Sequence, residues 1–293
     1  EMHIHYFIFS GGEPLMRKDS LIRICENHPD SLFMAFTNAT MVDEAFADEM
    51  LRVKNLVLVI SVEGIGESTD FRRGEGVYDR CVTAMDILRR KKLLFGLSCC
   101  YTAQTVEMIG SKEWFDQMLA FGAKFAWLFT YMPIGNSAET ELMVSAEQRK
   151  WMYEQVHKFR KTHGIFMLDF WNDGEYVDGC IAAGKEYLHI NAAGDIEPCA
   201  FIHYADHNIH TSTLLEALHG PLFTAYKERQ PFNANPLRPC PLLDNPDCLR
   251  EMVQETGTRS TDMQSPEDVV HLTDKTRAAA EAWAGIADEM RGI

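Results

Sequence analysis

The feature that most constrains the fold is a regular alternation of apolar and amphipathic segments in the first half of the sequence. Apolar stretches with the length of buried strands lie at residues 4–9, 32–36, 56–61, 94–101 and 125–131. Helical periodicity separates them, at residues 18–27, 43–52, 77–91 and 112–121, and continues at about 145–163. Strands that are joined by crossover helices form parallel sheets, so the pattern predicts an α/β fold.

Each predicted strand ends in polar residues or glycine. The endings are SGGE at 10–13, TNAT at 37–40, SVEG at 61–64, CYTAQ at 100–104 and YMPIG at 131–135. The carboxyl ends of parallel strands meet at one edge of a sheet, and the active sites of α/β proteins lie there. The sequence therefore predicts a functional site at this edge.

The composition restricts the classes of partner. The formal net charge of −15 argues against nucleic acid, because phosphate contacts require clustered Lys and Arg. No apolar run approaches the roughly 20 residues of a membrane span, and the N-terminal residues lack the features of a secretory signal. We therefore expect a cytoplasmic protein without a membrane partner.

The character of the sequence changes after about residue 164. A short strand pair is predicted at residues 187–191 and 195–199, turning at Gly194, and a terminal helix is predicted from an N-cap at Ser265 to about residue 290. We expect a barrel domain at 1–164, a small second domain at 165–255, and a polar linker with a terminal helix docked on the surface at 256–293.

The eight cysteines fall into two groups. Four lie in predicted helices or strands and are expected to be core residues: Cys25, Cys81, Cys99 and Cys100. Four lie in loop-like sequence beside Gly, Pro and Asp, where packing does not explain them: Cys180, Cys199, Cys240 and Cys248. Without a secretory signal, such grouping favours metal binding over disulfides. Three nearby histidines are expected in a solvated loop: His203, His207 and His210.

The first strand ending resembles a known motif. Gly11-Gly12-Glu13-Pro14, between a strand and a helix, resembles the GGEP motif of radical S-adenosylmethionine (SAM) enzymes. In that family the backbone of the motif holds the amino group of the SAM methionine moiety. The resemblance implies a partial (β/α)6 barrel, and the five strands counted here imply that its first strand is missing from this sequence.

Later strand endings extend the resemblance. Ser61-Val62-Glu63-Gly64 and the following Arg73 look like the family's fourth-strand pattern, although Glu63 stands where Asp is more usual. The resemblance implies that Ser61 and Glu63 contact the SAM ribose and that Arg73 binds the SAM carboxylate. The alternative is a surface ion pair of Arg73 with Asp70 or Glu75. Thr37-Asn38 matches a common third-strand ending, which makes Asn38 a further cofactor-binding candidate.

The C-terminal cysteines resemble a second module. Cys180 and Cys199 fit the pattern C-x13-G-x4-C, which is similar to the spacing in SPASM and Twitch domains. The resemblance implies one auxiliary [4Fe–4S] cluster held by Cys180, Cys199, Cys240 and Cys248, with thiolates as soft ligands. Asp244, Asp247 or an open iron site could replace Cys248, and a four-thiolate zinc site is the chemical alternative.

One family motif is absent from this sequence. Radical SAM enzymes carry C-x3-C-x2-C before GGEP, and these cysteines bind the [4Fe–4S] cluster that chelates SAM; here none of the residues before Gly11 is Cys. We expect these ligands upstream of a truncated N-terminus, so the chain as it stands should not cleave SAM, and we assign no catalytic residue.

The resemblance implies that the intact enzyme forms a 5′-deoxyadenosyl radical and abstracts hydrogen from a peptide, protein or small-molecule substrate. Ferredoxin or flavodoxin is the expected electron donor. The rival hypotheses are a non-catalytic iron–sulfur scaffold and a metal-dependent aldolase-type barrel. The latter leaves Gly11-Gly12-Glu13 and the cysteine spacing unexplained.

Overall fold

The structure is a computed structural model that describes residues 2–292. The chain forms two compact units, one of Glu1–Phe129 with Glu154–Asp169 and one of Thr130–Tyr153 with Phe170–Ile293. These units divide the chain differently from the boundaries expected at residues 164 and 255. The part of the chain that the structure describes has no helix long and apolar enough to cross a membrane.

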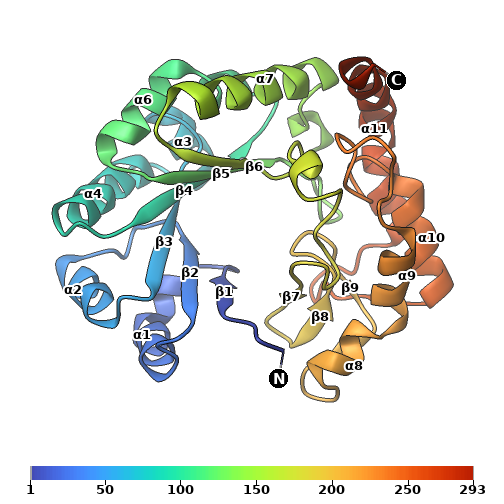
Figure 1. Ribbon diagram of the computed structural model, residues 1–293, viewed down its shortest axis with the longest axis horizontal. Helices are drawn as coiled ribbons and strands as arrows, with labels where there is room; N and C mark the ends of the chain where they lie inside the picture. The colour runs from blue at the N-terminus through green and yellow to red at the C-terminus, as the bar shows by residue number, and fades with distance from the viewer. Residues whose placement is uncertain (1, 293) are drawn as a thin grey trace. The chain divides into compact units, whose positions relative to one another are not determined.

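The first unit is a parallel sheet with helices along one side (Figure 1). Its six strands follow the sequence order β1 (Tyr6–Phe9), β2 (Leu32–Thr37), β3 (Leu56–Ser61), β4 (Phe95–Tyr101), β5 (Phe125–Thr130) and β6 (Phe166–Asp169). The connecting helices are α1 (Lys18–Asn27), α2 (Glu44–Val53), α3 (Glu67–Arg73), α4 (Val77–Arg90), α5 (Val106–Ile109) and α6 (Lys112–Phe121). The predicted alternation of strands and helices is confirmed.

The sheet contains one strand more than we predicted. β6 pairs in parallel with β5, with Phe166 opposite Phe125 and Leu168 opposite Leu128. The segment is only four residues long and begins with the exposed Phe166, so its local pattern is weak. Its partner strand decides its conformation, which sequence periodicity does not reveal.

The sheet has an apolar core and an exposed edge. Met34, Val57 and Val59 pack together with Phe36 and Trp127 on one face of the sheet. β1 lies at the edge, and its large side chains remain about 40% exposed: Tyr6 42%, Phe7 41% and Ile8 40%. β1 is therefore an exposed edge strand.

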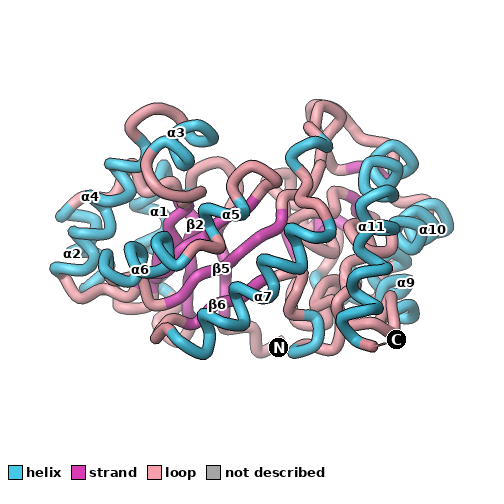
Figure 2. Tube along the Cα trace, turned by 90° about the horizontal axis from the view of Figure 1, so that it is seen from above, coloured by secondary structure: helices cyan, strands magenta, loops and turns pink. Residues whose placement is uncertain are grey.

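The second unit consists of short strands and a group of helices. Its strands are β7 (His189–Ile190), β8 (Asp195–Glu197), β9 (Tyr204–Ala205), β10 (His207–Asn208) and β11 (Arg259–Ser260). Its helices are α8 (Leu214–Leu218), α9 (Pro221–Arg229), α10 (Pro246–Thr256) and α11 (Val269–Arg291), together with the first half of α7 (Ala146–Thr162). Figure 2 shows α9, α10 and α11 gathered side by side.

The predicted hairpin is present. β7 and β8 pair antiparallel, and the chain turns through Gly194 at a φ of +85°. A Cβ atom on Gly194 would lie 2.9 Å from side-chain atoms of Ile209 and His210. Glycine is therefore required here both by the backbone conformation and by the close packing.

The terminal helix differs from the prediction. Asp268, not Ser265, caps α11, and its carboxylate accepts a hydrogen bond from Val270 N. Trp283 is buried against Leu237, to whose carbonyl the indole N–H donates at 2.8 Å. α11 is thus part of the core of the second unit and not a helix docked on the surface.

Candidate functional site

Glu13 joins the carboxyl ends of β1 and β2. Its Oε1 accepts from the Thr37 hydroxyl at 2.7 Å and from Leu15 N, and its Oε2 accepts from Asn38 N at 2.8 Å. Pro14 then opens a short 3-10 helix, Pro14–Arg17. Both carboxylate oxygens are engaged, so the main role of Glu13 in this structure is to fix the strand ends. Backbone groups of Gly11 and Gly12 are left to meet a ligand.

Gly11 and Gly12 lie at an open position. Both are exposed, and a Cβ atom built on either would meet no atom of the described residues within 4 Å. Gly11 has a φ of +98°, which side chains rarely tolerate. No packing within the described protein requires two glycines here, and this open backbone fits a bound molecule.

Asn38 and Ser61 lie on the same edge as Glu13. The Cys81 thiol of α4 lies 3.4 Å from the Asn38 carbonyl oxygen and 3.8 Å from that of Ser61, so it bridges the ends of β2 and β3. Burial raises the pKa of this thiol to about 11, so it is neutral and structural. The structure thus places Glu13, Asn38 and Ser61 along one edge, as predicted.

Glu63 and Arg73 pair with each other. Glu63 is fully buried, forms ion pairs with Arg72 at 3.2 Å and with Arg73 at a closer distance, and accepts from Cys100 N at 3.0 Å. The alternative surface pairing of Arg73 with Asp70 is not formed, because Asp70 accepts from the backbone at the start of α4. The bonds of Arg73 to Glu63 use Nε and Nη2.

This arrangement changes the interpretation of Glu63. A carboxylate held by two guanidinium groups and a backbone N–H is already satisfied, so it positions the arginines at the strand ends. Arg72 and Arg73 keep exposed fractions of 38% and 24% on their side chains. The pair therefore presents positive charge beside Ser61.

The sequence analysis missed a polar pair on this edge. The Tyr101 hydroxyl at the end of β4 donates to Asp169 at the end of β6 at 3.0 Å, and both residues are buried. Asp169 follows the apolar residues Phe166–Leu168, so a strand ending in a carboxylate was the available signal. It was overlooked because β6 was not predicted.

In the second unit, three of the four candidate cysteines each accept a hydrogen bond on sulfur. Tyr187 donates its hydroxyl to Cys199 Sγ at 2.7 Å. Ala182 N donates to Cys180 Sγ at 3.5 Å, and Leu243 N donates to Cys240 Sγ at 3.3 Å. Hydrogen bonds of this kind stabilise the thiolate form that binds iron.

The same three thiols are electrostatic neighbours. Burial raises the pKa of Cys180 to about 12, and the Cys199 thiol adds to this shift. Burial likewise raises the pKa of Cys240 well above its usual value, with Asp244 and Cys180 as the next contributors. Each of these thiols therefore resists ionisation without a metal, and a bound cation would reverse that balance.

A fully buried tyrosine is electrostatically coupled to these thiols. Burial raises the pKa of Tyr226 in α9, and the thiols of Cys180, Cys199 and Cys240 add to the shift. Its hydroxyl has no hydrogen-bond partner among the described residues. This orphaned donor and the three thiols fit a sulfur-containing group.

The candidates for the fourth ligand are placed differently. Cys248 lies in the first turn of α10. Burial raises its pKa, and the next contributors are Glu251, Arg229 and Asp247, none of which is a thiol. Asp247 pairs with Arg277 at 2.5 Å. No group of three His, Cys, Asp or Glu side chains within residues 2–292 is arranged to hold a metal ion.

Asp244 is already engaged. Its Oδ1 pairs with the buried Arg149 of α7 at 2.5 Å, and its Oδ2 accepts from Cys240 N at 3.0 Å. Arg149 also donates to Asn172 and stacks on the Trp283 ring, 4.3 Å from its centroid. The ion pair holds the segment that carries Cys240, which is a structural role.

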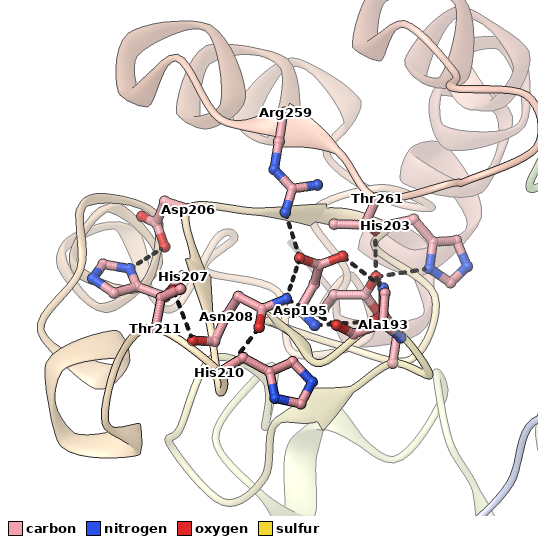
Figure 3. A network of polar contacts seen from close by, with 12 residues as sticks. Ala193, Asp195, His203, Asp206, His207, Asn208, His210, Thr211, Arg259 and Thr261 are labelled. Atoms are coloured by element: carbon pink, nitrogen blue, oxygen red, sulfur yellow. Dashed lines mark hydrogen bonds and ion pairs between the residues drawn. The ribbon is translucent and has the colours of Figure 1, made fainter.

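Two of the three histidines pair with carboxylates in a polar network, whereas the side chain of His210 is exposed, as expected, and only its backbone N–H donates to Asn208 (Figure 3). His203 pairs with the buried Glu197 at 3.4 Å, and His207 pairs with Asp206 at 2.7 Å. Burial opposes ionisation of Glu197, but hydrogen bonds from His189, His203 and Thr261 outweigh it and lower its pKa to about 2. This network fixes the hairpin that ends at Cys199.

Comparisons of the sequence give partial matches. No protein-family model matches it. It is 38% identical to an uncharacterized protein of Archaeoglobus fulgidus over 87 residues, 29% of this chain and 21% of that protein. It is 29% identical to the Fe-coproporphyrin III synthase of Methanosarcina barkeri over 104 residues, 35% of this chain and 26% of the enzyme. The matches thus span only about a quarter of these relatives or less.

Comparisons of the structure cover more of the chain. The enzyme anSMEcpe with bound AdoMet (SAM) matches with a TM-score of 0.59 at 14% identity, over 97% of this chain and 81% of the enzyme. SuiB of Streptococcus suis bound to SAM matches with a TM-score of 0.61 at 18% identity, over 80% of this chain and 60% of SuiB. Both are radical SAM enzymes.

The chain has the radical SAM fold. The predicted partial barrel is thereby confirmed. Its sheet has six parallel strands and not the five that we counted in the sequence, so the strand count does not support a missing first strand. Other structures of the two neighbours with this fold hold peptides: anSMEcpe with the Cp18Cys peptide and SuiB with the precursor peptide SuiA.

Proposed function

We propose that the protein is a radical SAM enzyme with an auxiliary [4Fe–4S] cluster in its second unit. The observation that carries the cluster assignment is that Cys180, Cys199 and Cys240 each accept a hydrogen bond on sulfur. All three thiols also contribute to the raised pKa of the buried Tyr226. The radical SAM fold of the chain supports the enzyme assignment. Fold alone does not fix function, so both need a direct test.

The proposed SAM site lies at the carboxyl edge of the sheet. When bound and reduced by one electron, SAM supplies a 5′-deoxyadenosyl radical that abstracts hydrogen from the substrate. Gly11 and Gly12 bind the SAM amino group through their backbone, with Pro14 and Glu13 holding the turn, and Asn38 completes this edge. Ser61 contacts the ribose, and Arg73, oriented by Glu63, attracts the SAM carboxylate.

The proposed cluster ligands are Cys180, Cys199, Cys240 and Cys248. The first three have the supporting contacts described above, whereas Cys248 rests on the sequence spacing. Asp244 pairs with Arg149, and Asp247 pairs with Arg277. These ion pairs disfavour either carboxylate as a replacement for Cys248. An open iron position is the remaining alternative to Cys248.

The substrate we favour is a peptide, because structures of both neighbours hold peptides. Ferredoxin or flavodoxin would deliver the electron in the cytoplasm. The cluster that chelates SAM would be held by cysteines encoded upstream of Glu1.

Anaerobic reconstitution tests the auxiliary cluster. The chain should bind about four irons with broad visible absorbance, and Cys199→Ala should lose both. Cys25→Ala is the matched control, because Cys25 is a buried cysteine of α1 with a pKa raised to about 11 by burial. Stoichiometric zinc with no iron uptake would defeat the assignment.

A second experiment separates an enzyme from a non-catalytic scaffold. The gene upstream of Glu1 should encode C-x3-C-x2-C, and the protein expressed with that segment should release 5′-deoxyadenosine from SAM on reduction. If the protein takes up iron but the upstream gene lacks these cysteine codons, or if no 5′-deoxyadenosine is released, the non-catalytic scaffold is favoured.

A further inference from the structure

Two tyrosines of the second unit, the partly buried Tyr187 and the fully buried Tyr226, have its cysteines as neighbours. Tyr187 donates its hydroxyl to Cys199 Sγ at 2.7 Å, which is short for a bond to sulfur. Its ring packs edge-on against Phe170 at a centroid distance of 6.4 Å and an interplanar angle of 86°. The orientation of this hydroxyl is therefore fixed by both ends of the side chain.

Tyr226 is more deeply buried than Tyr187 and has no acceptor of its own. The residue has 0% exposure, and its ring packs edge-on against Phe232 at 5.4 Å. Its hydroxyl finds no partner among the described residues. An unpaired buried hydroxyl is costly, so such a group calls for an explanation.

The surroundings of Tyr226 indicate the missing acceptor. After burial, the thiols of Cys180, Cys199 and Cys240 are the groups that contribute to its raised pKa. Phenylalanine would pack in the same space without the cost of an unpaired hydroxyl, so apolar packing alone does not account for tyrosine. Thiolate and sulfide sulfurs are acceptors that a cluster at this place would supply.

We propose that Tyr187 and Tyr226 are positioning residues that donate O–H···S hydrogen bonds to the auxiliary cluster and its ligands, and that they raise its reduction potential. This inference rests on the function proposed above. Donors to sulfur stabilise the more negative, reduced state of an iron–sulfur cluster, and outer hydrogen bonds tune metal sites in this way. The auxiliary cluster would thereby accept one electron more readily.

The test compares Tyr187→Phe, Tyr226→Phe and the double variant with the wild type after anaerobic reconstitution. Tyr204→Phe is the matched control, because Tyr204 is a buried tyrosine of the same unit whose hydroxyl donates to the Glu267 carbonyl. Iron content is measured first. A titration with dithionite, followed by electron paramagnetic resonance, then gives the reduced fraction at each potential.

We expect equal iron content in all variants and a lower midpoint potential for each tyrosine variant. At a fixed potential, the ratio of reduced to oxidised cluster should fall roughly three- to tenfold per lost hydroxyl, and further in the double variant. Tyr204→Phe should match the wild type. Iron uptake with unchanged potentials overturns this inference alone, whereas a wild type that binds no iron overturns the proposed function and this inference with it.

The metal-free protein gives a second readout, which does not need a loaded cluster. Tyr226→Phe removes an unpaired hydroxyl, so the urea midpoint should stay equal or rise. Tyr187→Phe removes a formed hydrogen bond, so the midpoint should fall. A clear fall for Tyr226→Phe would mean that its hydroxyl is already satisfied in the metal-free protein, and would overturn its assignment as a donor to the cluster.

Discussion

Replacing Arg149 by methionine should strongly destabilise the second unit. Arg149 is 3% exposed, and its guanidinium donates to Asp244 at 2.5 Å, to Asn172 at 2.8 Å and to the Trp171 carbonyl at 3.0 Å. Methionine keeps the length and apolar packing of the side chain but leaves the Asp244 carboxylate buried without its cation. Removing one partner of a buried ion pair costs about 3–5 kcal/mol.

That loss is large beside the roughly 5–15 kcal/mol by which domains are stable. Urea denaturation of the metal-free protein at neutral pH, followed by tryptophan fluorescence, measures it. Arg89→Met is the control, because Arg89 pairs with Asp86 at 2.7 Å while both are about half exposed (53% and 47%). An exposed pair contributes only about 0.2–1 kcal/mol.

A double-mutant cycle isolates the ion pair. With Asp244→Asn in the background, Arg149→Met should cost at least about 2 kcal/mol less, because the uncompensated charge is gone. Strictly additive effects, or a loss for Arg149→Met no larger than that of Arg89→Met, would refute the assignment of a stabilising buried pair.

Three further changes test other parts of the structure. Because folding lowers the pKa of Glu197 to about 2, this group contributes about 3 kcal/mol to the free energy of unfolding above pH 4.5. That contribution is lost as the pH falls towards 2. Glu197→Gln should therefore make the stability of the metal-free protein less dependent on pH in this range. Gly96→Ala would place a Cβ 2.2 Å from the Phe125 ring and should lower the melting temperature, whereas Gly285→Ala, with open space, should not. Glu13→Gln should lower the urea midpoint by an amount equivalent to about 1 kcal/mol, because Asn38 N loses its carboxylate acceptor; an unchanged midpoint would contradict this role.

Features that depend on local pattern were predictable from the sequence. The strands β2 to β5 are apolar runs between periodic helices, and the turn at Gly194 follows from a short hairpin signal. The alignment of Glu13, Asn38 and Ser61 on one edge followed from parallel topology, because the carboxyl ends of parallel strands must coincide. Each of these depends on spacing over a few residues or on a rule of connection.

The partners of polar side chains were decided only by the tertiary structure. Glu63 pairs with Arg73 because α3 folds back onto the end of β3. Asp70 and Glu75 are nearer to Arg73 along the sequence, so the sequence favoured them as its ion-pair partners. Tyr226, whose pKa the thiols help to raise, lies in a helix that begins 22 residues after Cys199. Contacts between distant segments depend on how the helices and strands pack, and the spacing of residues along the chain does not predict that packing.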